Sequence, residues 1–306
     1  MAKMAGGVPG GANPAEHMKY GIYYAYWEKQ WGGEYAPYAS RVADLGFDIL
    51  EISCAGVAGM TDRQIGELNS AAAGSGITLS GNYGPAPGED ITSADPAVVR
   101  NAFDFWRATF KNLERLHVPF VAGALYSYWP VDYSKPVDKE GDRARSVAEM
   151  KKLAKLAAEH GISLGMEVLN RFEGYLLNTS EEAVAYVRDV DEKNVYVMLD
   201  TFHMNIEEDS MAGAIRTAGK RLGHLHAGEA NRRPPRDGGR FDWRDIGAAL
   251  RDIGYDKTVV MEPFVMSGGQ VGGDIKVWRN LMDDVSGEAL DREARESVKF
   301  LRGVLG

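Results

Sequence analysis

The sequence predicts an α/β fold in which eight parallel strands close into a single (β/α)8 TIM barrel. Short apolar, β-prone segments alternate with longer helical patterns through nearly the whole chain, and such alternation implies parallel strands joined by right-handed crossovers. No Gly-x-Gly-x-x-Gly motif follows the first strand, as it would in an open dinucleotide-binding sheet. Polar residues instead recur at the C-terminal ends of several strands, where a barrel builds its active site.

The first half of the chain supplies four of these strands. They are expected at 21–26, 47–53, 77–82 and 118–125. Helices are expected at 34–45, from Asp62 behind the capping residue Thr61, and from Asp95-Pro96 to about Leu116. The segment 126–143 is too long for a plain connection and indicates a lid or rim loop before a helix at 144–160.

The second half supplies the other four strands, expected at 162–167, 195–200, 222–226 and 259–263. Ser180, followed by two glutamates, begins a helix with a favourable dipole. Further helices are expected at 209–219, 242–253, 273–283 and 289–304.

Composition sets the broad class of the protein. The 306 residues are 44 % hydrophobic and 26 % charged, which is typical of a soluble globular chain. A net charge of −9 argues against a nucleic-acid partner, and no apolar run is long enough to cross a membrane. Residues 1–17 are expected to be a flexible N-terminal extension, with the catalytic barrel at 18–306 and the cytoplasm as the default location.

Four polar residues close four successive predicted strands: Glu167, Asp200, His226 and Glu262. Alone, each carboxylate is more simply a helix cap and the histidine a hydrogen-bonded core residue. Neighbouring strands of a barrel end at one mouth, however, so together these residues predict the ligands of one divalent metal. Three carboxylates and one imidazole favour Mn²⁺, Co²⁺ or Mg²⁺ in six coordination over tetrahedral Zn²⁺.

This ligand set indicates proton chemistry beside a carbonyl group. Four protein ligands leave two positions that a vicinal hydroxy-ketone can fill, and the metal then stabilises charge on the carbonyl oxygen. Glu167 and Glu262, on non-adjacent strands, can flank the reacting carbon as base and acid. None of the predicted strand ends carries a lysine, so a Schiff-base mechanism has no nucleophile.

Further candidate residues follow the same strands. Glu173, His203 and Arg232 lie in loops from which they can bind sugar hydroxyls, although position alone favours a solvated charge for Arg232. An apolar wall is expected from the aromatic residues Tyr23, Trp31, Trp129 and Phe264, for which a plain core role is the alternative.

From Met18 to its C-terminus the chain resembles the ketose 3-epimerases, the group of D-tagatose 3-epimerase and D-psicose (D-allulose) 3-epimerase. The resemblance is carried by long, ordered motifs. They include Glu167-Val168-Leu169-Asn170-Arg171-Phe172-Glu173, Met198-Leu199-Asp200-Thr201-Phe202-His203, Gly223-His224-Leu225-His226 and Met261-Glu262-Pro263-Phe264.

The resemblance implies a TIM barrel that holds Mn²⁺ or Co²⁺ through Glu167, Asp200, His226 and Glu262. It implies that Glu167 and Glu262 move the proton at C3 of a free ketose through a cis-enediolate, on pairs such as D-fructose/D-psicose or D-tagatose/D-sorbose. The C1–C3 oxygens would contact Glu173, His203 and Arg232, with Trp129 and Phe264 lining the pocket and Tyr23 and Trp31 nearby. A homodimer or homotetramer is expected on the same ground.

Three other functions remain open from the residues alone. An aldose–ketose isomerase would use the same chemistry one carbon along. A metal-dependent endonuclease would need more metal ligands and a basic rim, whereas this chain has six histidines and is acidic. A non-catalytic sugar-binding barrel would not require both glutamates.

Overall fold

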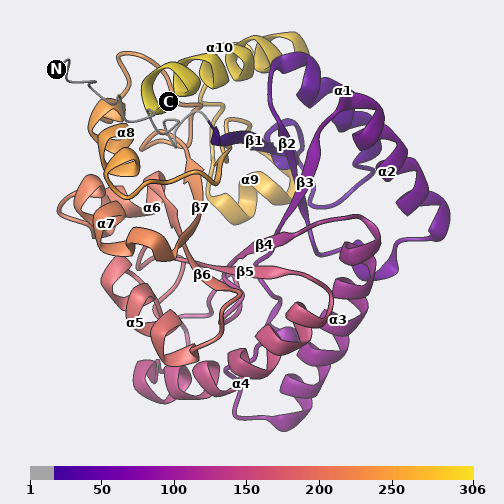
Figure 1. Cartoon of the computed structure of the whole chain (residues 1–306), viewed down its shortest axis with the longest axis vertical. Helices are drawn as coiled ribbons and strands as arrows, with labels where there is room; N and C mark the ends of the chain where they lie inside the picture. Colours follow the sequence, from indigo (N-terminus) through magenta and orange to yellow (C-terminus); the bar gives the residue numbers. More distant parts are fainter. Residues whose placement is uncertain (1–16) are drawn as a thin grey trace, which may run out of the picture.

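The computed structural model describes residues 17–306, and their eight parallel strands form a closed barrel in sequence order (Figure 1). The strands are β1 Lys19–Tyr23, β2 Ile49–Ser53, β3 Thr78–Asn82, β4 Phe120–Gly123, β5 Ser163–Glu167, β6 Val195–Asp200, β7 Leu222–Ala227 and β8 Thr258–Met261. Because β8 pairs with β1, the sheet has no free edge. The predicted TIM barrel is therefore confirmed. The predicted extension, except for His17, lies outside the described residues.

Helices surround the strands as an outer ring (Figure 1). The helices, of which α9 is not part of this ring, are α1 Ala36–Leu45, α2 Asp62–Ser75, α3 Pro96–Arg115, α4 Lys139–Glu159, α5 Ser180–Val190, α6 Thr201–Glu207, α7 Met211–Ala218, α8 Trp243–Asp252, α9 Gly269–Ile275 and α10 Gly287–Leu305. No helix in the described part of the chain combines the length and apolar character needed to cross a membrane.

Helix α3 illustrates how the sequence determines this outer ring. Its residues Ala102, Trp106, Phe110 and Leu113 are all buried, and their spacing of three or four places them on one face, which packs against the barrel. The Asp95 side chain accepts a hydrogen bond from the amide of Ala97 and begins the helix. The expected start of α2 is confirmed as well, because Thr61 forms a capping box there.

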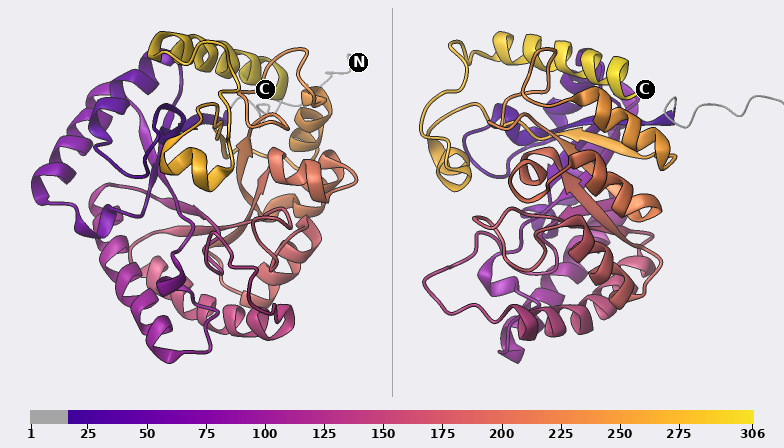
Figure 2. Two further views of the ribbon diagram at one scale, coloured as in Figure 1. Left: turned by 180° about the vertical axis from the view of Figure 1, so that it is seen from behind. Right: turned by 90° about the vertical axis from the view of Figure 1, so that its left-hand side faces the viewer.

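Some predicted boundaries were wrong, and capping or turn geometry explains them. Helix α4 begins at Lys139 rather than 144 because Asp138 caps it, which shortens the rim loop. The helix predicted at 273–283 is instead α9, which spans Gly269–Ile275 and ends where Lys276 adopts a left-handed conformation. Helix α9 lies over the open end of the barrel, near its axis (Figure 2).

Strand β7 contains a bulge directly before its two histidines, His224 and His226. The register between β6 and β7 slips at Gly223, since Val197 pairs with Leu222 but Met198 pairs with His224. A Cβ at Gly223 would lie 2.5 Å from the Cβ of Tyr196. Only glycine therefore fits this bulge without displacing the neighbouring strand.

Replacing Gly223 with alanine is expected to destabilise the barrel by about 1–3 kcal/mol, because the new methyl group overpacks against Tyr196. The measurement is the free energy of unfolding from denaturant titration. Gly66→Ala is the control: Gly66 lies in α2 with nothing within 4 Å of an added Cβ, so this change is expected to stabilise by about 0.8–1 kcal/mol. An unchanged unfolding midpoint for Gly223→Ala would contradict the assigned packing.

Candidate active site

The four predicted metal ligands meet at the mouth of the barrel. Glu167 and Asp200 are the last residues of β5 and β6, His226 lies in β7, and Glu262 follows β8 directly. Each offers one ligand atom, and these atoms all lie within 4.8 Å of one another. Equivalent positions on consecutive strands thus bring together residues separated by almost one hundred positions in the sequence.

Three carboxylates this close, in a largely buried place, repel one another. Burial and the nearby Glu262 carboxylate raise the pKa of Glu167 well above its ordinary value. The permanently charged cation that the chain places here is Arg232, whose Nη1 lies 3.1 Å from Glu262 Oε2 and 3.4 Å from Asp200 Oδ2. One guanidinium group does not balance three carboxylates, so the cluster fits a further, divalent cation.

The Nδ1 atom of His226, which has no hydrogen-bond partner, also indicates a cation at this cluster. Its Nε2 lies 2.6 Å from Glu51 Oε1, whereas its buried Nδ1 forms no hydrogen bond and lies 3.5 Å from Glu262 Oε2. A buried polar atom without a partner is costly. A metal ion bound among these four residues would supply that partner.

A second layer of polar residues lies above this cluster. His203 Nε2 is 3.7 Å from both Glu167 Oε1 and Asp200 Oδ2. The backbone amide of Asn170 donates to His203 Nδ1 at 3.2 Å, so Nδ1 is the acceptor and Nε2 carries the proton. His203 therefore presents an N–H group toward the carboxylates.

Arg232 and Glu173 complete this layer. Arg232 Nη2 lies 3.3 Å from Glu173 Oε1, and the guanidinium is 3.7 Å from the ring centroid of Phe202. The backbone of Arg232 is held at a φ of 64°, a conformation that is rare for a residue with a side chain. Arg232 is buried. The interpretation of Arg232 as a solvated loop charge was therefore wrong.

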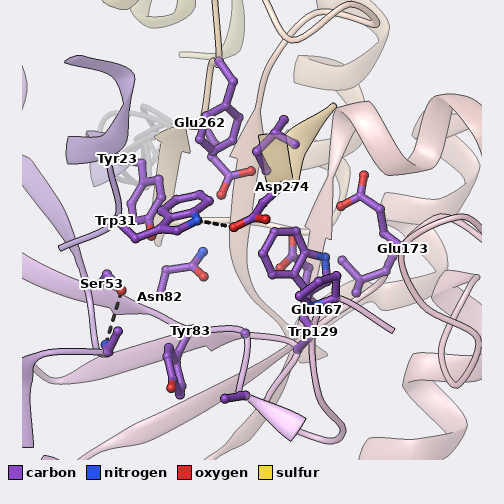
Figure 3. A pocket seen from close by; sticks show the side chains of 18 of the residues that line it. Tyr23, Trp31, Ser53, Asn82, Tyr83, Trp129, Glu167, Glu173, Glu262 and Asp274 are labelled. Carbon is purple, nitrogen blue, oxygen red and sulfur yellow. Dashed lines mark hydrogen bonds between the residues drawn. The ribbon is translucent and has the colours of Figure 1, made fainter. Parts of the chain in front are cut away.

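The four predicted aromatic residues form one wall of a cavity of about 360 Å³. The ring centroid of Trp31 lies 6.1 Å from Phe264, 6.3 Å from Trp129 and 6.5 Å from Tyr23. Glu167, Glu173 and Glu262 also line this cavity, together with His203 and Arg232, and Figure 3 shows several of these side chains pointing into it. Asp200 and His226 are not among the residues that line it.

Three residues of the site had no predicted role. Glu51 binds His226 from β2, Asn170 donates to Glu173 Oε1 at 3.1 Å, and Asp274 accepts a hydrogen bond of 2.7 Å from Trp31 Nε1 (Figure 3). The signal for Glu51 was a lone carboxylate inside the apolar strand Ile49–Ser53. No local pattern pointed to Asp274, which lies in α9, the helix whose position was predicted wrongly.

Comparisons with known proteins agree with this geometry. A family model described as a xylose isomerase-like TIM barrel matches residues 39–303. The D-psicose 3-epimerase of Ruminiclostridium cellulolyticum is 53 % identical over 288 residues, which cover 94 % of this chain and 98 % of that protein. The D-psicose 3-epimerase of Agrobacterium fabrum is 49 % identical over 289 residues, with 94 % and 100 % covered.

Solved structures give the same result. The crystal structure of D-psicose 3-epimerase with D-tagatose from Clostridium cellulolyticum superposes with a TM-score of 0.92 at 53 % identity, covering 94 % of this chain and 99 % of that one. The chain therefore belongs to the xylose isomerase-like TIM barrel family and, within it, to the ketose 3-epimerases, which are isomerases.

Proposed function

We propose that this protein inverts the configuration at C3 of free ketoses, interconverting pairs such as D-fructose and D-psicose or D-tagatose and D-sorbose, with the help of one divalent cation. The observation that carries the proposal is the pair of glutamates, Glu167 and Glu262. They come from β5 and β8, line one cavity, and present carboxylate oxygens within 4.8 Å of each other. Inversion needs two such groups, one to remove the proton and one to return it on the opposite face.

Glu167, Asp200, His226 and Glu262 would hold the cation, with Mn²⁺ or Co²⁺ favoured and Mg²⁺ as an alternative. When bound, the cation supplies Lewis-acid stabilisation for negative charge on the substrate carbonyl oxygen. The hard carboxylate oxygens suit these ions.

The protein's own groups would position the sugar and move the proton. Glu167 and Glu262 exchange the C3 proton, one on each face, through a cis-enediolate. A general acid or base must lie within reach of the proton that it moves, and both glutamates line the cavity that would hold the sugar. His203, Glu173 and Arg232 bind the C1–C3 oxygens, while the aromatic wall packs against the carbon skeleton and excludes water.

Product analysis by NMR after incubation with D-fructose tests the reaction type. Inversion at C3 produces D-psicose. Transfer of the proton between C1 and C2 would instead produce an aldose and would make the protein an aldose–ketose isomerase. A panel of ketoses, including tagatose, sorbose, ribulose and xylulose, then identifies the preferred substrate.

Glu262→Gln and Glu167→Gln are each expected to lower kcat for epimerisation by about 10²–10⁴-fold, because each removes one of the two proton carriers. In D₂O, each variant is expected to retain slow deuterium exchange at C3 of one epimer only, that is, the epimer whose proton the remaining glutamate removes. Glu67→Gln, on the exposed surface of α2, is the control and is expected to keep parental turnover. Parental epimerisation by either site variant would exclude the two-carboxylate mechanism.

Chelation followed by dialysis is expected to abolish turnover, and Mn²⁺ or Co²⁺ is expected to restore it. The measurement is the epimerisation rate of stripped protein supplied with each ion in turn, beside unfolding temperatures that confirm the fold. Full activity in protein shown by elemental analysis to contain less than about 0.01 metal per chain would contradict a metal-dependent reaction.

We further propose a homodimer or homotetramer located in the cytoplasm. Phe172 and Trp278, which are 73 % and 74 % exposed, support association, because large apolar side chains at the surface are common in interfaces. Light scattering is expected to give two or four times the chain mass of 33.5 kDa. A single-chain mass at micromolar concentration would contradict this.

A further inference from the structure

Glu51 is a fully buried carboxylate that lies outside the substrate cavity. It occupies the middle of β2, inside the barrel, with none of its surface exposed. A buried charge of this kind is very costly unless it is paired and hydrogen-bonded. The partners of Glu51 therefore show what it does.

These partners converge from across the barrel. Oε1 lies 2.6 Å from His226 Nε2, and Oε2 accepts a hydrogen bond of 2.9 Å from Ser80 Oγ. Oε2 also lies 3.1 Å from Nε2 of His224, although at an angle that does not make a hydrogen bond. The strongest contact of Glu51 is thus with the one histidine among the candidate metal ligands.

This contact determines which nitrogen of His226 is available. An ionised carboxylate only accepts hydrogen bonds, so Nε2 of His226 must carry a proton and donate it in the hydrogen bond to Glu51. A histidine that binds a metal is neutral, and in that form the lone pair of the imidazole resides on Nδ1. Nδ1 is the nitrogen that faces Glu262 and forms no hydrogen bond.

Glu51, His224 and His226 also form a cluster whose ligand atoms lie within 4.8 Å of one another, so a second metal site must be considered. Two ligands bound at about 2.0–2.2 Å to one ion lie about 3 Å or more apart. The 2.6 Å between Glu51 Oε1 and His226 Nε2 is shorter than that. This contact is therefore a hydrogen bond.

We propose that Glu51 is a positioning residue of the metal centre, which holds the His226 ring and its tautomer so that Nδ1 points at the cation. This inference rests on the proposed metal-dependent function. The hydrogen bonds and ion pairs of Glu51 go to Ser80, His224 and His226, and Glu51 does not line the cavity. Its route to the metal centre is therefore through His226. Partners of metal-bound histidines that play this role contribute about 10–100-fold to metal affinity.

The test compares Mn²⁺ binding to the chelator-stripped parent, Glu51→Gln and Glu229→Gln by titration calorimetry. Glu51→Gln is expected to raise the Mn²⁺ Kd about 10–100-fold at one ion per chain, with epimerase kcat largely recovered at saturating Mn²⁺. Glu229→Gln is the matched control. Glu229 is also a buried carboxylate just beyond β7, but it binds Trp243 Nε1 at 3.0 Å and no candidate ligand. It is expected to keep the parental Kd even if the metal-free protein unfolds at a lower temperature.

The outcomes separate the inference from the function. A parental Kd in Glu51→Gln overturns the positioning role and leaves the epimerase proposal standing. Two ions per parent chain, one of them lost in Glu51→Gln, would make the cluster a second metal site instead. A parent that binds no ion overturns the metal centre and this inference together.

A second measurement does not depend on the variant's stability. In parent protein loaded with Mg²⁺, a diamagnetic ion that permits NMR, ¹H–¹⁵N spectra of the histidine rings are expected to place the His226 proton on Nε2. A proton on Nδ1 would overturn the assignment.

Discussion

The crowding of three carboxylates at one mouth of the barrel is the constraint on which the rest of the site depends. Glu167, Asp200 and Glu262 cannot avoid one another, because the closed sheet fixes the ends of β5, β6 and β8 around a single axis. Water cannot screen them well, since Glu167 and Asp200 are buried. Three clustered carboxylates are unfavourable without a cation. They lie at the barrel mouth, where the proposed proton transfer takes place.

The surrounding residues are arranged by depth around this cluster. Below it, Glu51 and His226 form a buried hydrogen-bonded pair in the barrel interior. Above it, His203, Glu173 and Arg232 form a polar layer, with Asn170 linking two of them. The aromatic wall and α9 cover the opening, where Asp274 holds Trp31. The carboxylate cluster therefore lies between the buried Glu51–His226 pair and the apolar cover formed by the aromatic residues.

Much of this site could be predicted from the sequence because a barrel has simple geometry. Side chains alternate along a strand, and consecutive strands are neighbours, so residues that end β5 to β8 must meet. Glu173 and Arg232 come from loops, whose course no periodicity describes, and the role of Arg232 was inferred only through the family resemblance. His203 was also expected in a loop, but it lies in the short helix α6, which begins directly after β6 where Asp200 caps it. Arg232 has a left-handed backbone conformation, and its guanidinium lies near the rings of Phe202 and Phe264. Sequence patterns reveal neither feature.

Contacts between distant segments were the least predictable. Glu51 and His226 are 175 residues apart, and only the presence of a charge within an apolar strand indicated that Glu51 needed a partner. Asp274 was unpredictable because its helix is short, rich in glycine and follows an irregular loop. The starts of α2 and α3 were predicted correctly because their caps, Thr61 and Asp95, are local signals formed by residues that are adjacent in the sequence.

Anomalous diffraction at the manganese edge, from crystals grown with Mn²⁺, tests the central claim most directly. The account predicts one strong peak per chain, bounded by Glu167, Asp200, His226 Nδ1 and Glu262. A map without a peak among these four side chains, or with manganese bound only elsewhere, would contradict it.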